Sequence, residues 1–530
     1  MAETKDQEAV PAPPRNVRVI MLGLMITMML AMLDNLIVGT AMPTIVGELG
    51  GLDHLAWVVT AYTLAIAVST PLWGKFGDLY GRKGIFMSSI VVFLIGSALS
   101  GMAQDMGQLI AFRAIQGLGG GGLIVGVMAI IGDLVPPRER GRYQGMMAAV
   151  MGIATIGGPL VGGTITDHLG WRWAFYINLP LGAVSLFVIS TVLHLPKKRI
   201  KARVDYTGAA LLSIGLTALV LVTSWGGTEY DWGSVQIVGL SVLGAASLAA
   251  FGWAETRAAE PIIPLRIFRN GNFTLMNVIG FIVGFVMFGG VTFLPLFQQS
   301  VQGASATNSG LLLLPMMLPV MVVSLFVGRA VTRTGRYRMY PIIGGAALIV
   351  GLYLLSTMDT DTSRLTSGLY MAVMGAGLGF MIQMSMLVGQ NSLEMRDMGA
   401  GSSTITLTRT IGGSFGVALM GAIFSSRVAD TMAEETGPAG EKAVGGGQLT
   451  PELIEQLPTH IKDGYLSAVS NGTHQVFLWG TAVAALAFLA SWFVKEVPLR
   501  GAAPAKEDAG SAGDAGPGSA QAEAEAPVKV

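Results

Sequence analysis

Two charged residues stand inside long apolar stretches of this 530-residue sequence, and together they could bind and release a proton. Asp34 lies in MLAMLDNLIVGTAMP (29–43), and Arg113 lies in LIAFRAIQGLGGGG (109–122). A charge within a membrane helix is costly, so it usually faces a partner or a water-filled cavity. Burial disfavours an ionised aspartate, whereas a nearby arginine favours it. The sequence therefore predicts that Asp34 carries a proton with Arg113 as its partner; the alternative is a permanently ionised structural pair.

The depth of the two residues supports a shared site. Asp34 and Arg113 lie about eight and about seven residues from the outer ends of their helices, which at about 1.5 Å per residue places both roughly 10–12 Å below the outer surface. Helical periodicity brings further residues onto the same faces. We expect proton and substrate to compete for one cavity, lined in the N-terminal half by Thr27, Ala31, Val38, Gln116, Gly117 and Gly120, and in the C-terminal half by Asn277, Gln298 and Gln383.

Fourteen membrane-spanning helices are predicted to position these residues. Hydrophobic residues make up 52% of the chain and charged residues only 12%, whereas a soluble protein has about 25% charged residues. A helix that crosses a bilayer needs about 20 apolar residues. Runs of this kind cover residues 18–42, 55–75, 85–102, 107–131, 144–166, 173–194, 206–225, 235–253, 272–297, 309–330, 340–357, 366–389, 402–424 and 474–494.

The basic residues predict how the spans are oriented, because the cytoplasmic loops of membrane proteins are rich in Lys and Arg. Basic clusters follow every even-numbered span from the second to the tenth, as in KKRIKAR (197–203), whereas GGTEYDWGS (226–234) after the seventh span is acidic. The first apolar run is too long for a cleaved signal peptide. We therefore predict a multi-pass protein of the plasma (inner) membrane with both termini in the cytoplasm.

Other classes of function lack the residues that they need. The formal net charge is zero, so nucleic acid is not an expected partner. The chain has no cysteine and its five histidines never stand at metal-ligand spacing, so neither a metal site nor an enzyme is predicted. The G-x-x-x-x-G-K-[ST] motif of ATP-binding loops does not occur. We expect no cofactor, with the proton gradient as the source of energy.

One short motif occurs twice. WGKFGDLYGRKG (73–84) follows the second span, and the weaker copy VGRAVTRTGRYR (327–338) follows the tenth. Both copies place a Gly-Arg pair seven residues after the first glycine. Two copies in corresponding loops indicate repeated halves around a central pathway, which is the architecture of secondary transporters.

These motifs resemble the major facilitator superfamily, in particular its fourteen-span drug:proton antiporters, and the likeness covers nearly all of residues 15–497. The family's loop pattern G-x-x-x-D-x-x-G-R-K/R is matched by Gly74, Asp78, Gly81, Arg82 and Lys83. The resemblance implies that this loop gates the cytoplasmic side, with Asp78 facing the positive end of span 13 near Ser402 and Ser403. Arg336 and Arg409 are further candidates for the gate, although Arg409 could instead extend to the membrane surface.

Three further patterns carry the resemblance. Span 4 has the R-x-x-Q-G pattern, and span 1 is similar to L-D-x-T-I-V-N-V-A-L-P, with Leu36 and Gly39 in place of its Thr and Asn. Span 5 resembles the antiporter motif of exporters through Gly158, Pro159, Gly162 and Gly163. Glycines four residues apart also permit close helix contact. Generic tight packing therefore explains these span 5 residues equally well.

The predicted fold is an all-α integral membrane protein of the major facilitator type, with two pseudo-symmetric six-helix bundles and an inserted two-helix hairpin. Its predicted parts are an N-terminal cytoplasmic tail (1–17), the first bundle (18–194), a linker with spans 7 and 8 (195–254), the second bundle with an outer loop at 425–473 (255–497), and a disordered cytoplasmic tail (498–530).

The predicted function is proton-coupled export of hydrophobic or amphipathic small molecules by a functional monomer. No carboxylate lies well inside a C-terminal span, which favours neutral or singly charged substrates over dications. Two alternatives stay open: export of a lipid or endogenous metabolite with a partner docked on loop 425–473, and a membrane-embedded sensor or enzyme. The expected partners of a transporter are its substrate, protons and the lipid bilayer.

Overall fold

The computed structural model describes residues 17–49, 55–135, 137–194, 205–227, 229–303, 313–444 and 458–499. These residues form long helices, and no β-strand occurs among them. Thirteen of the described helices are long and apolar enough to cross a membrane. Long apolar segments form helices in lipid because a helix satisfies every backbone N–H and C=O group internally, where lipid offers no partner.

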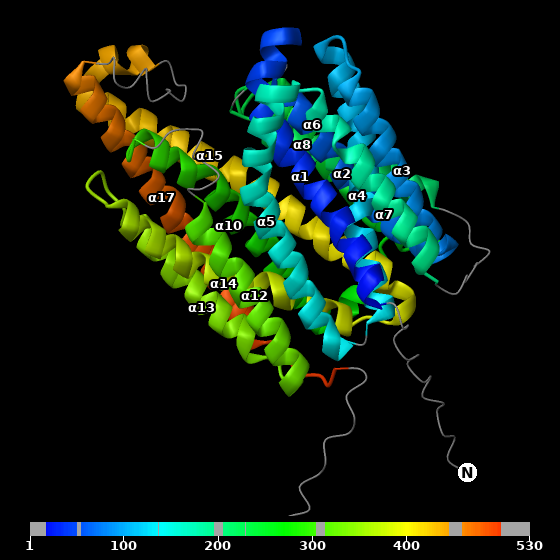
Figure 1. The fold of residues 1–530 in the computed structure, drawn as a ribbon. Helices are drawn as coiled ribbons and strands as arrows, with labels where there is room; N and C mark the ends of the chain where they lie inside the picture. The colour runs from blue at the N-terminus through cyan, green and yellow to red at the C-terminus, as the bar shows by residue number, and fades with distance from the viewer. Residues whose placement is uncertain are drawn as a thin grey trace, which may run out of the picture.

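The first bundle occupies the blue to green part of Figure 1. Its helices are α1 (Val17–Leu49), α2 (Leu55–Tyr80), α3 (Arg82–Gly101), α4 (Met106–Leu134), α5 (Pro137–Leu169), α6 (Trp173–Tyr176) and α7 (Asn178–Val192). Local sequence sets several boundaries. Gly81 separates α2 from α3 with a φ of 98°, which a residue without a Cβ adopts freely. Asp105 caps α4, since its carboxylate accepts the backbone N–H of Gln108 at 2.8 Å.

The second bundle follows from residue 265 onward. Its elements are η2 (Leu265–Arg269), α10 (Gly271–Ser300), α12 (Leu314–Thr334), α13 (Met339–Ser356), α14 (Arg364–Asn391), η4 (Met395–Asp397), α15 (Met398–Val444) and α17 (Thr459–Trp492). Asn270 caps α10 and Ser363 caps α14 through their side-chain oxygens. Gly335 ends α12 in the left-handed region with a φ of 70°, the usual conformation after a helix C-terminus.

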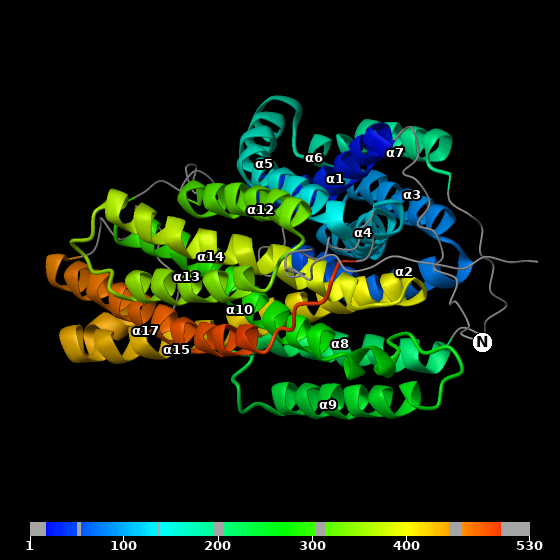
Figure 2. The same ribbon diagram turned by 90° about the horizontal axis from the view of Figure 1, so that it is seen from below.

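An inserted hairpin joins the two bundles. It consists of α8 (Tyr206–Trp225) and α9 (Val235–Glu255), which pack on each other. α8 contacts α2 of the first bundle and α15 of the second, and α9 lies outside α8 (Figure 2). The hairpin therefore covers one side of the junction between the bundles, as an addition to the repeated six-helix halves.

The bundles meet along a few helix pairs, chiefly α5 with α12 and α2 with α15. At the first of these junctions a side-chain carbon on Gly145 would lie 2.9 Å from the Cα atom of Leu325. Glycine thus lets the two backbones approach closely, as small residues do in membrane helix pairs. α1 begins at the lower end of Figure 1, where residues 494–499 also lie. We call this the inner end of the molecule and the opposite end the outer end.

The fifth predicted span, 144–166, is the one that is not among these thirteen, and it lies within α5. This helix has 33 residues, but its apolar part is short and covers Gly145–Ala154. α5 nevertheless packs along both α1 and α12. The predicted fold class, an all-α membrane protein with two bundles and an inserted hairpin, is confirmed.

The predicted outer loop at 425–473 is wrong over most of its described part. α15 continues to Val444 and α17 already begins at Thr459. Hydropathy marks where a helix leaves the apolar layer, whereas backbone hydrogen bonding continues as long as the residues favour a helix. Ala and Glu, which are strong helix formers, are frequent between residue 425 and Val444 and extend the helix.

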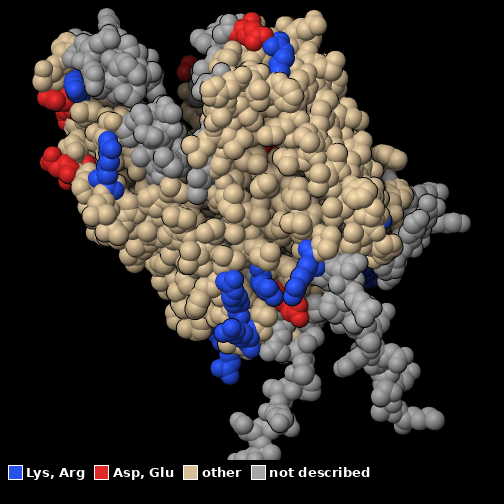
Figure 3. Space-filling model, in the orientation of Figure 1, with Lys and Arg blue, Asp and Glu red and all other residues tan. Residues whose placement is uncertain are grey.

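The distribution of charge fits a membrane protein. Figure 3 shows Lys and Arg gathered at the inner end of the face in view, and a broad band without charged side chains across the middle.

The predicted tail 1–17 lies almost wholly outside the described residues, as do the linker at 195–204 and the tail from residue 500.

Candidate functional site

Asp34 lies at the centre of a buried polar network in the first bundle. Nη1 of Arg113 on α4 donates to Oδ2 of Asp34 on α1 at 2.6 Å, and neither side chain has exposed surface. The predicted contact between these residues is confirmed. A charge-assisted bond of this length is strong, and its partners are held away from water.

Two amides complete the network around Asp34. Nε2 of Gln116 donates to Oδ1 at 2.7 Å, and Nδ2 of Asn178 on α7 donates to the same oxygen at 2.7 Å. Gln116 also accepts from Nη1 of Arg113 at 2.9 Å, which closes a ring of three side chains. Asp34 thus accepts at both oxygens and donates at neither, which is the pattern of an ionised carboxylate.

Asn178 was missed by sequence reasoning. It is 1% exposed, and its amide also donates to Oγ of Ser97 on α3 at 2.9 Å. Ser97 in turn donates to the carbonyl oxygen of Phe175 at 2.8 Å. Four helices therefore converge on one carboxylate. The available signal was weak: Asn178 is the single amide residue in the predicted span 173–194.

An aromatic ring closes the other side of the arginine. The Cζ atom of Arg113 lies 3.8 Å from the ring centroid of Tyr62 on α2 and 5.9 Å from that of Phe175. Tyr62 is 1% exposed. Nothing in the spacing of the sequence indicated this residue, because the contact joins two helices through their packing alone.

The glycines of α4 do not leave room for a ligand, contrary to the prediction for Gly117 and Gly120. A side-chain carbon on Gly117 would lie 2.4 Å from the carbonyl oxygen of Tyr62, and one on Gly120 would lie 3.2 Å from Ile66. The space is filled by α2. Small residues on membrane helices favour close backbone contact, and here that contact places Tyr62 beside Arg113.

The other residues predicted to line a cavity in the first bundle are buried in helix contacts. Thr27 is fully buried and its hydroxyl shares a hydrogen bond with Ser185 of α7. Ala31 and Val38 belong to apolar clusters of the bundle. The structure therefore does not bring these three residues together in an open cavity.

The predicted polar residues of the second bundle are likewise buried. Asn277 on α10 accepts from the hydroxyl of Thr408 on α15 at 3.2 Å and donates to the carbonyl oxygen of Phe273 at 2.9 Å. Nε2 of Gln298 lies 3.5 Å from the sulfur of Met371. Gln383 is 3% exposed. Asn277 and Gln298 thus join α10 to α15 and α14 within the second bundle.

Asp78 at the inner end of α2 joins the two bundles. Its Oδ1 accepts the backbone N–H of Gly399 at 3.1 Å, and its Oδ2 accepts that of Ala400 at 2.9 Å. These N–H groups belong to the first turn of α15, where the helix has no internal acceptor for them and carries partial positive charge. The predicted position of Asp78 at the positive end of this helix is confirmed.

Close backbone approach makes the Asp78 contact possible. A side-chain carbon on Gly74 would lie 2.7 Å from Oγ of Ser403, and one on Gly399 would lie 2.4 Å from Oδ1 of Asp78. Arg82 donates to Asp78 at 3.0 Å and to the carbonyl oxygen of Ala129 at 2.8 Å. It also pairs with Asp133 of α4.

Three of the predicted gate residues do not reach the Asp78 contact. Nζ of Lys83 donates to the carbonyl oxygen of Ser190 at 2.7 Å, so it joins α3 to α7 within the first bundle. Arg336 is exposed. Arg409 lies nine residues beyond Ala400, about 14 Å along the helix axis. The sequence analysis selected Lys83 and Arg336 from the two copies of the loop motif and Arg409 from its depth, and neither criterion specifies the direction of a side chain.

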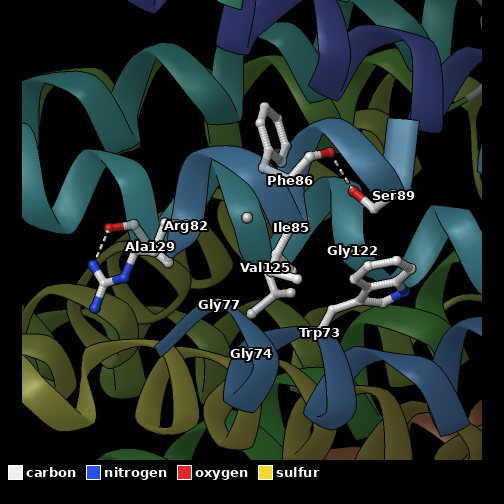
Figure 4. Close-up of a pocket in the computed structure, with 11 residues that line it drawn as sticks. Trp73, Gly74, Gly77, Arg82, Ile85, Phe86, Ser89, Gly122, Val125 and Ala129 are labelled. Atoms are coloured by element: carbon white, nitrogen blue, oxygen red, sulfur yellow. Dashed lines mark hydrogen bonds between the residues drawn. The ribbon is translucent and has the colours of Figure 1, made fainter. Parts of the chain in front are cut away.

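A small cavity lies beside the gate residues, between α2, α3 and α4 (Figure 4). Its volume is about 20 Å³, which is room for about one water molecule. Gly74, Gly77 and Arg82 line it together with Trp73, Ile85, Phe86, Ser89, Gly122, Val125, Gly126 and Ala129. The space is too small for an organic substrate.

The glycines of the predicted antiporter motif face α1. A side-chain carbon on Gly158 would lie 2.5 Å from Cβ of Leu36, and one on Gly162 would lie 3.0 Å from Cα of Ile37. Both contacts fall within one turn of Asp34 along α1. Gly163 has nothing within 4 Å, and the side chain of Pro159 lies outside the described residues.

An ion pair fixes the outer end of α1. Glu48 accepts from Nε1 of Trp171 at 2.7 Å and pairs with Arg172. The Arg172 guanidinium, together with the Trp171 N–H group, lowers the pKa of Glu48 below its ordinary value. Arg172 also stacks on Trp171, with 4.4 Å between its Cζ atom and the ring centroid.

No group of three potential metal ligands occurs among the described residues.

The amino-acid sequence of this chain is similar to those of known proteins. The family model described as the Major Facilitator Superfamily matches residues 24–417. An uncharacterized MFS-type transporter of Mycobacterium tuberculosis is 40% identical over 483 residues, which cover 91% of this chain and 70% of that protein. The multidrug transporter protein MdtP of Bacillus subtilis is 35% identical over 502 residues, which cover 90% of this chain and 93% of MdtP.

Solved structures share the fold. The MFS proton:xylose symporter XylE matches 92% of this chain and 97% of its own chain, with a TM-score of 0.61 and 13% sequence identity. The human organic anion transporter MFSD10 matches 91% of this chain and 100% of its own, with a TM-score of 0.60 and 14% identity. At these identities the likeness concerns the fold alone.

Proposed function

Because the chain belongs to the Major Facilitator Superfamily, whose members move small molecules across membranes, we propose that it exports hydrophobic or amphipathic compounds in exchange for protons. The relatives named as multidrug transporters, MdtP and multidrug resistance protein 3 of Bacillus subtilis, support drugs as the substrate class. The inner end then faces the cytoplasm of a plasma membrane. The protein works as a monomer, with the two bundles (18–194 and 255–497) as its moving parts.

The observation that carries the proton-coupling proposal is the buried network around Asp34. Its carboxylate is the single acidic side chain in the described middle portions of the spans, and it is held ionised by Arg113, Gln116 and Asn178. Protonation would remove the charge that Arg113 pairs with and weaken all three bonds. Because the network joins α1, α4 and α7, a change in its charge alters the packing of those helices.

The Asp78 contact supplies a gate for the same cycle. It closes the inner end by joining α2 of one bundle to α15 of the other. Alternating access requires this contact to break when the inner end opens. Proton binding at Asp34 favours release of the substrate at the outer end, and proton loss to the cytoplasm resets the transporter.

Proton release on substrate binding tests the coupling. The purified protein is placed in weak buffer with a pH indicator, and ethidium, a singly charged aromatic cation, is added as the probe. The wild type and a control variant, Asp361→Asn, which changes an exposed carboxylate, are expected to release protons equally. Asp34→Asn is expected to bind ethidium without proton release. Equal release from Asp34→Asn and wild type would show that Asp34 is not the carrier.

Transport in proteoliposomes tests export itself. The reconstituted protein is expected to move ethidium when a pH gradient is imposed and to stop when an ionophore collapses the gradient. A rate that is independent of the gradient would contradict proton coupling. A drug-susceptibility panel in a host that lacks its own pumps would then define the range of substrates.

A further inference from the structure

Arg113 has one close contact besides its hydrogen bonds. The guanidinium of Arg113 lies against the face of Tyr62, 3.8 Å from its centroid. This is a cation–π contact, in which the negative face of the ring attracts the cation. Both side chains are almost fully buried, so water does not weaken the attraction.

The contact matters most when Asp34 is protonated. The charged or titratable groups in contact at this site are Asp34 of α1, Arg113 of α4 and Tyr62 of α2; the remaining polar contacts come from Gln116, Asn178 and Ser97. Once Asp34 is neutral, Arg113 is a buried cation with no carboxylate beside it. Leaving a buried charge unpaired is strongly unfavourable.

Few other groups can hold the arginine in that state. Nη1 keeps the bond to Oε1 of Gln116, whereas Nε and Nη2 have no hydrogen-bond partner among the described residues. The ring of Phe175 is more distant, at 5.9 Å. The ring of Tyr62 is thus the main stabilising contact for the guanidinium after proton binding.

We propose that Tyr62 is a positioning residue that holds Arg113 in the protonated state and so sets the pH at which Asp34 takes up its proton. This inference rests on the proposed role of Asp34. While Asp34 is ionised, its carboxylate holds the guanidinium, and the ring adds little; once Asp34 is protonated, the ring is the main group left to hold it, so the ring stabilises the protonated state more than the ionised one. Removing the ring therefore favours the ionised form and moves proton uptake to lower pH.

The ring carries this role, and the hydroxyl does not. Oη of Tyr62 is buried and has no hydrogen-bond partner among the described residues. Tyr62→Phe keeps the aromatic face and is the matched control. Tyr62→Leu and Tyr62→Met keep an apolar side chain of smaller volume without a π face. A desolvated cation–π contact corresponds to roughly a tenfold change in proton affinity, or about one pH unit.

Infrared spectroscopy tests this without a substrate. The carbonyl stretch of a protonated carboxylic acid is followed against pH in the purified protein, and the part that Asp34→Asn removes is assigned to Asp34. In Tyr62→Phe, the Asp34 band is expected to have the same pH midpoint as in the wild type. Tyr62→Leu and Tyr62→Met are expected to titrate about one pH unit lower. Either aliphatic variant suffices if the other does not fold.

The outcomes separate the two proposals. The role of the ring would be overturned if an aliphatic variant had the same pH midpoint for the Asp34 band as the wild type. It would also be overturned if Tyr62→Phe shifted that midpoint as much as the aliphatic variants do. If Asp34→Asn shows the same pH-dependent band as the wild type, Asp34 is not the proton carrier. The proposed function of Asp34 then fails, and with it the role of Tyr62 in proton uptake.

Discussion

Replacing Asp78 by Asn should open the inner end of the molecule. The carboxylate accepts the N–H groups of Gly399 and Ala400 and one N–H group of Arg82. An asparagine has one acceptor oxygen, and its NH₂ group would face one of these donors. The substitution also removes a negative charge from the positive end of α15. The closed arrangement loses stability, whereas the open arrangement, in which the contact is already broken, loses little.

The size of the effect follows from these contacts. The side chain of Asp78 is 7% exposed, so its bonds are largely protected from water. The loss of one hydrogen bond to a charged group costs about 1.5–3 kcal/mol, and the loss of a charge at a helix N-terminus costs about 0.3–2 kcal/mol. Together they amount to roughly 2–5 kcal/mol, which would change the ratio of closed to open molecules by roughly 30- to 5,000-fold.

Spin labels can measure this ratio because the chain has no cysteine of its own. Tyr80 at the end of α2 and Arg396 before α15 are both exposed and flank the Asp78 contact. Cysteines introduced at these positions carry the labels without any background to remove. Electron–electron resonance is expected to give one short distance in the wild type and a longer population in Asp78→Asn.

The control is Glu229→Gln, which removes an exposed carboxylate on the α8–α9 connection at the outer end. Its distance distribution should match that of the wild type. If Asp78→Asn retains the short distance alone, the Asp78 bonds do not hold the inner end closed, and the gate must be attributed to the remaining contacts between the bundles.

Two further predictions concern stability. Gly162→Ala would place a carbon 3.0 Å from Cα of Ile37, so we expect a loss of about 1–3 kcal/mol and a lower melting temperature in detergent; Gly163→Ala meets nothing within 4 Å and should melt like the wild type. The pKa of Glu48 lies below its ordinary value of 4.5, so its pairing with Arg172 stabilises the fold above that pH and is lost as the pH falls further. Melting curves of the wild type and Glu48→Gln should therefore differ most above pH 4.5 and converge in stronger acid, and a constant difference across this range would contradict the role of the ion pair.

Apolar run length and basic residues predicted the fold because the bilayer restricts both. A spanning helix has a set length and a set direction, so depth in the membrane can be counted along the sequence. Depth was enough to pair Asp34 with Arg113, whereas the resemblance of the loop motif to the family pattern placed Asp78 at the end of α15.

The remainder of the site depends on how the helices turn and pack. Tyr62 and Asn178 look like ordinary residues of apolar spans, and only the contacts of α2 and α7 bring them to the network. Gly117 was predicted to leave space because a glycine has no side chain, but the neighbouring helix fills that space. A sequence shows where a side chain is missing and does not show what approaches it.

The length of α15 has a mechanical consequence. It is one helix of 47 residues, about 70 Å long at about 1.5 Å per residue, whereas the apolar layer of a bilayer is about 30 Å thick. Its inner end carries the contact with Asp78, and near its outer end Glu435 accepts from Ser467 of α17 at 2.6 Å. The helix runs across the whole molecule in Figure 1. A 10° tilt of the helix about a point near Arg409 would therefore move Glu435, which lies about 39 Å away along the axis, by roughly 7 Å. If release of the Asp78 contact tilted α15 as a rigid helix, the outer ends of α15 and α17 would therefore move much farther than its inner end.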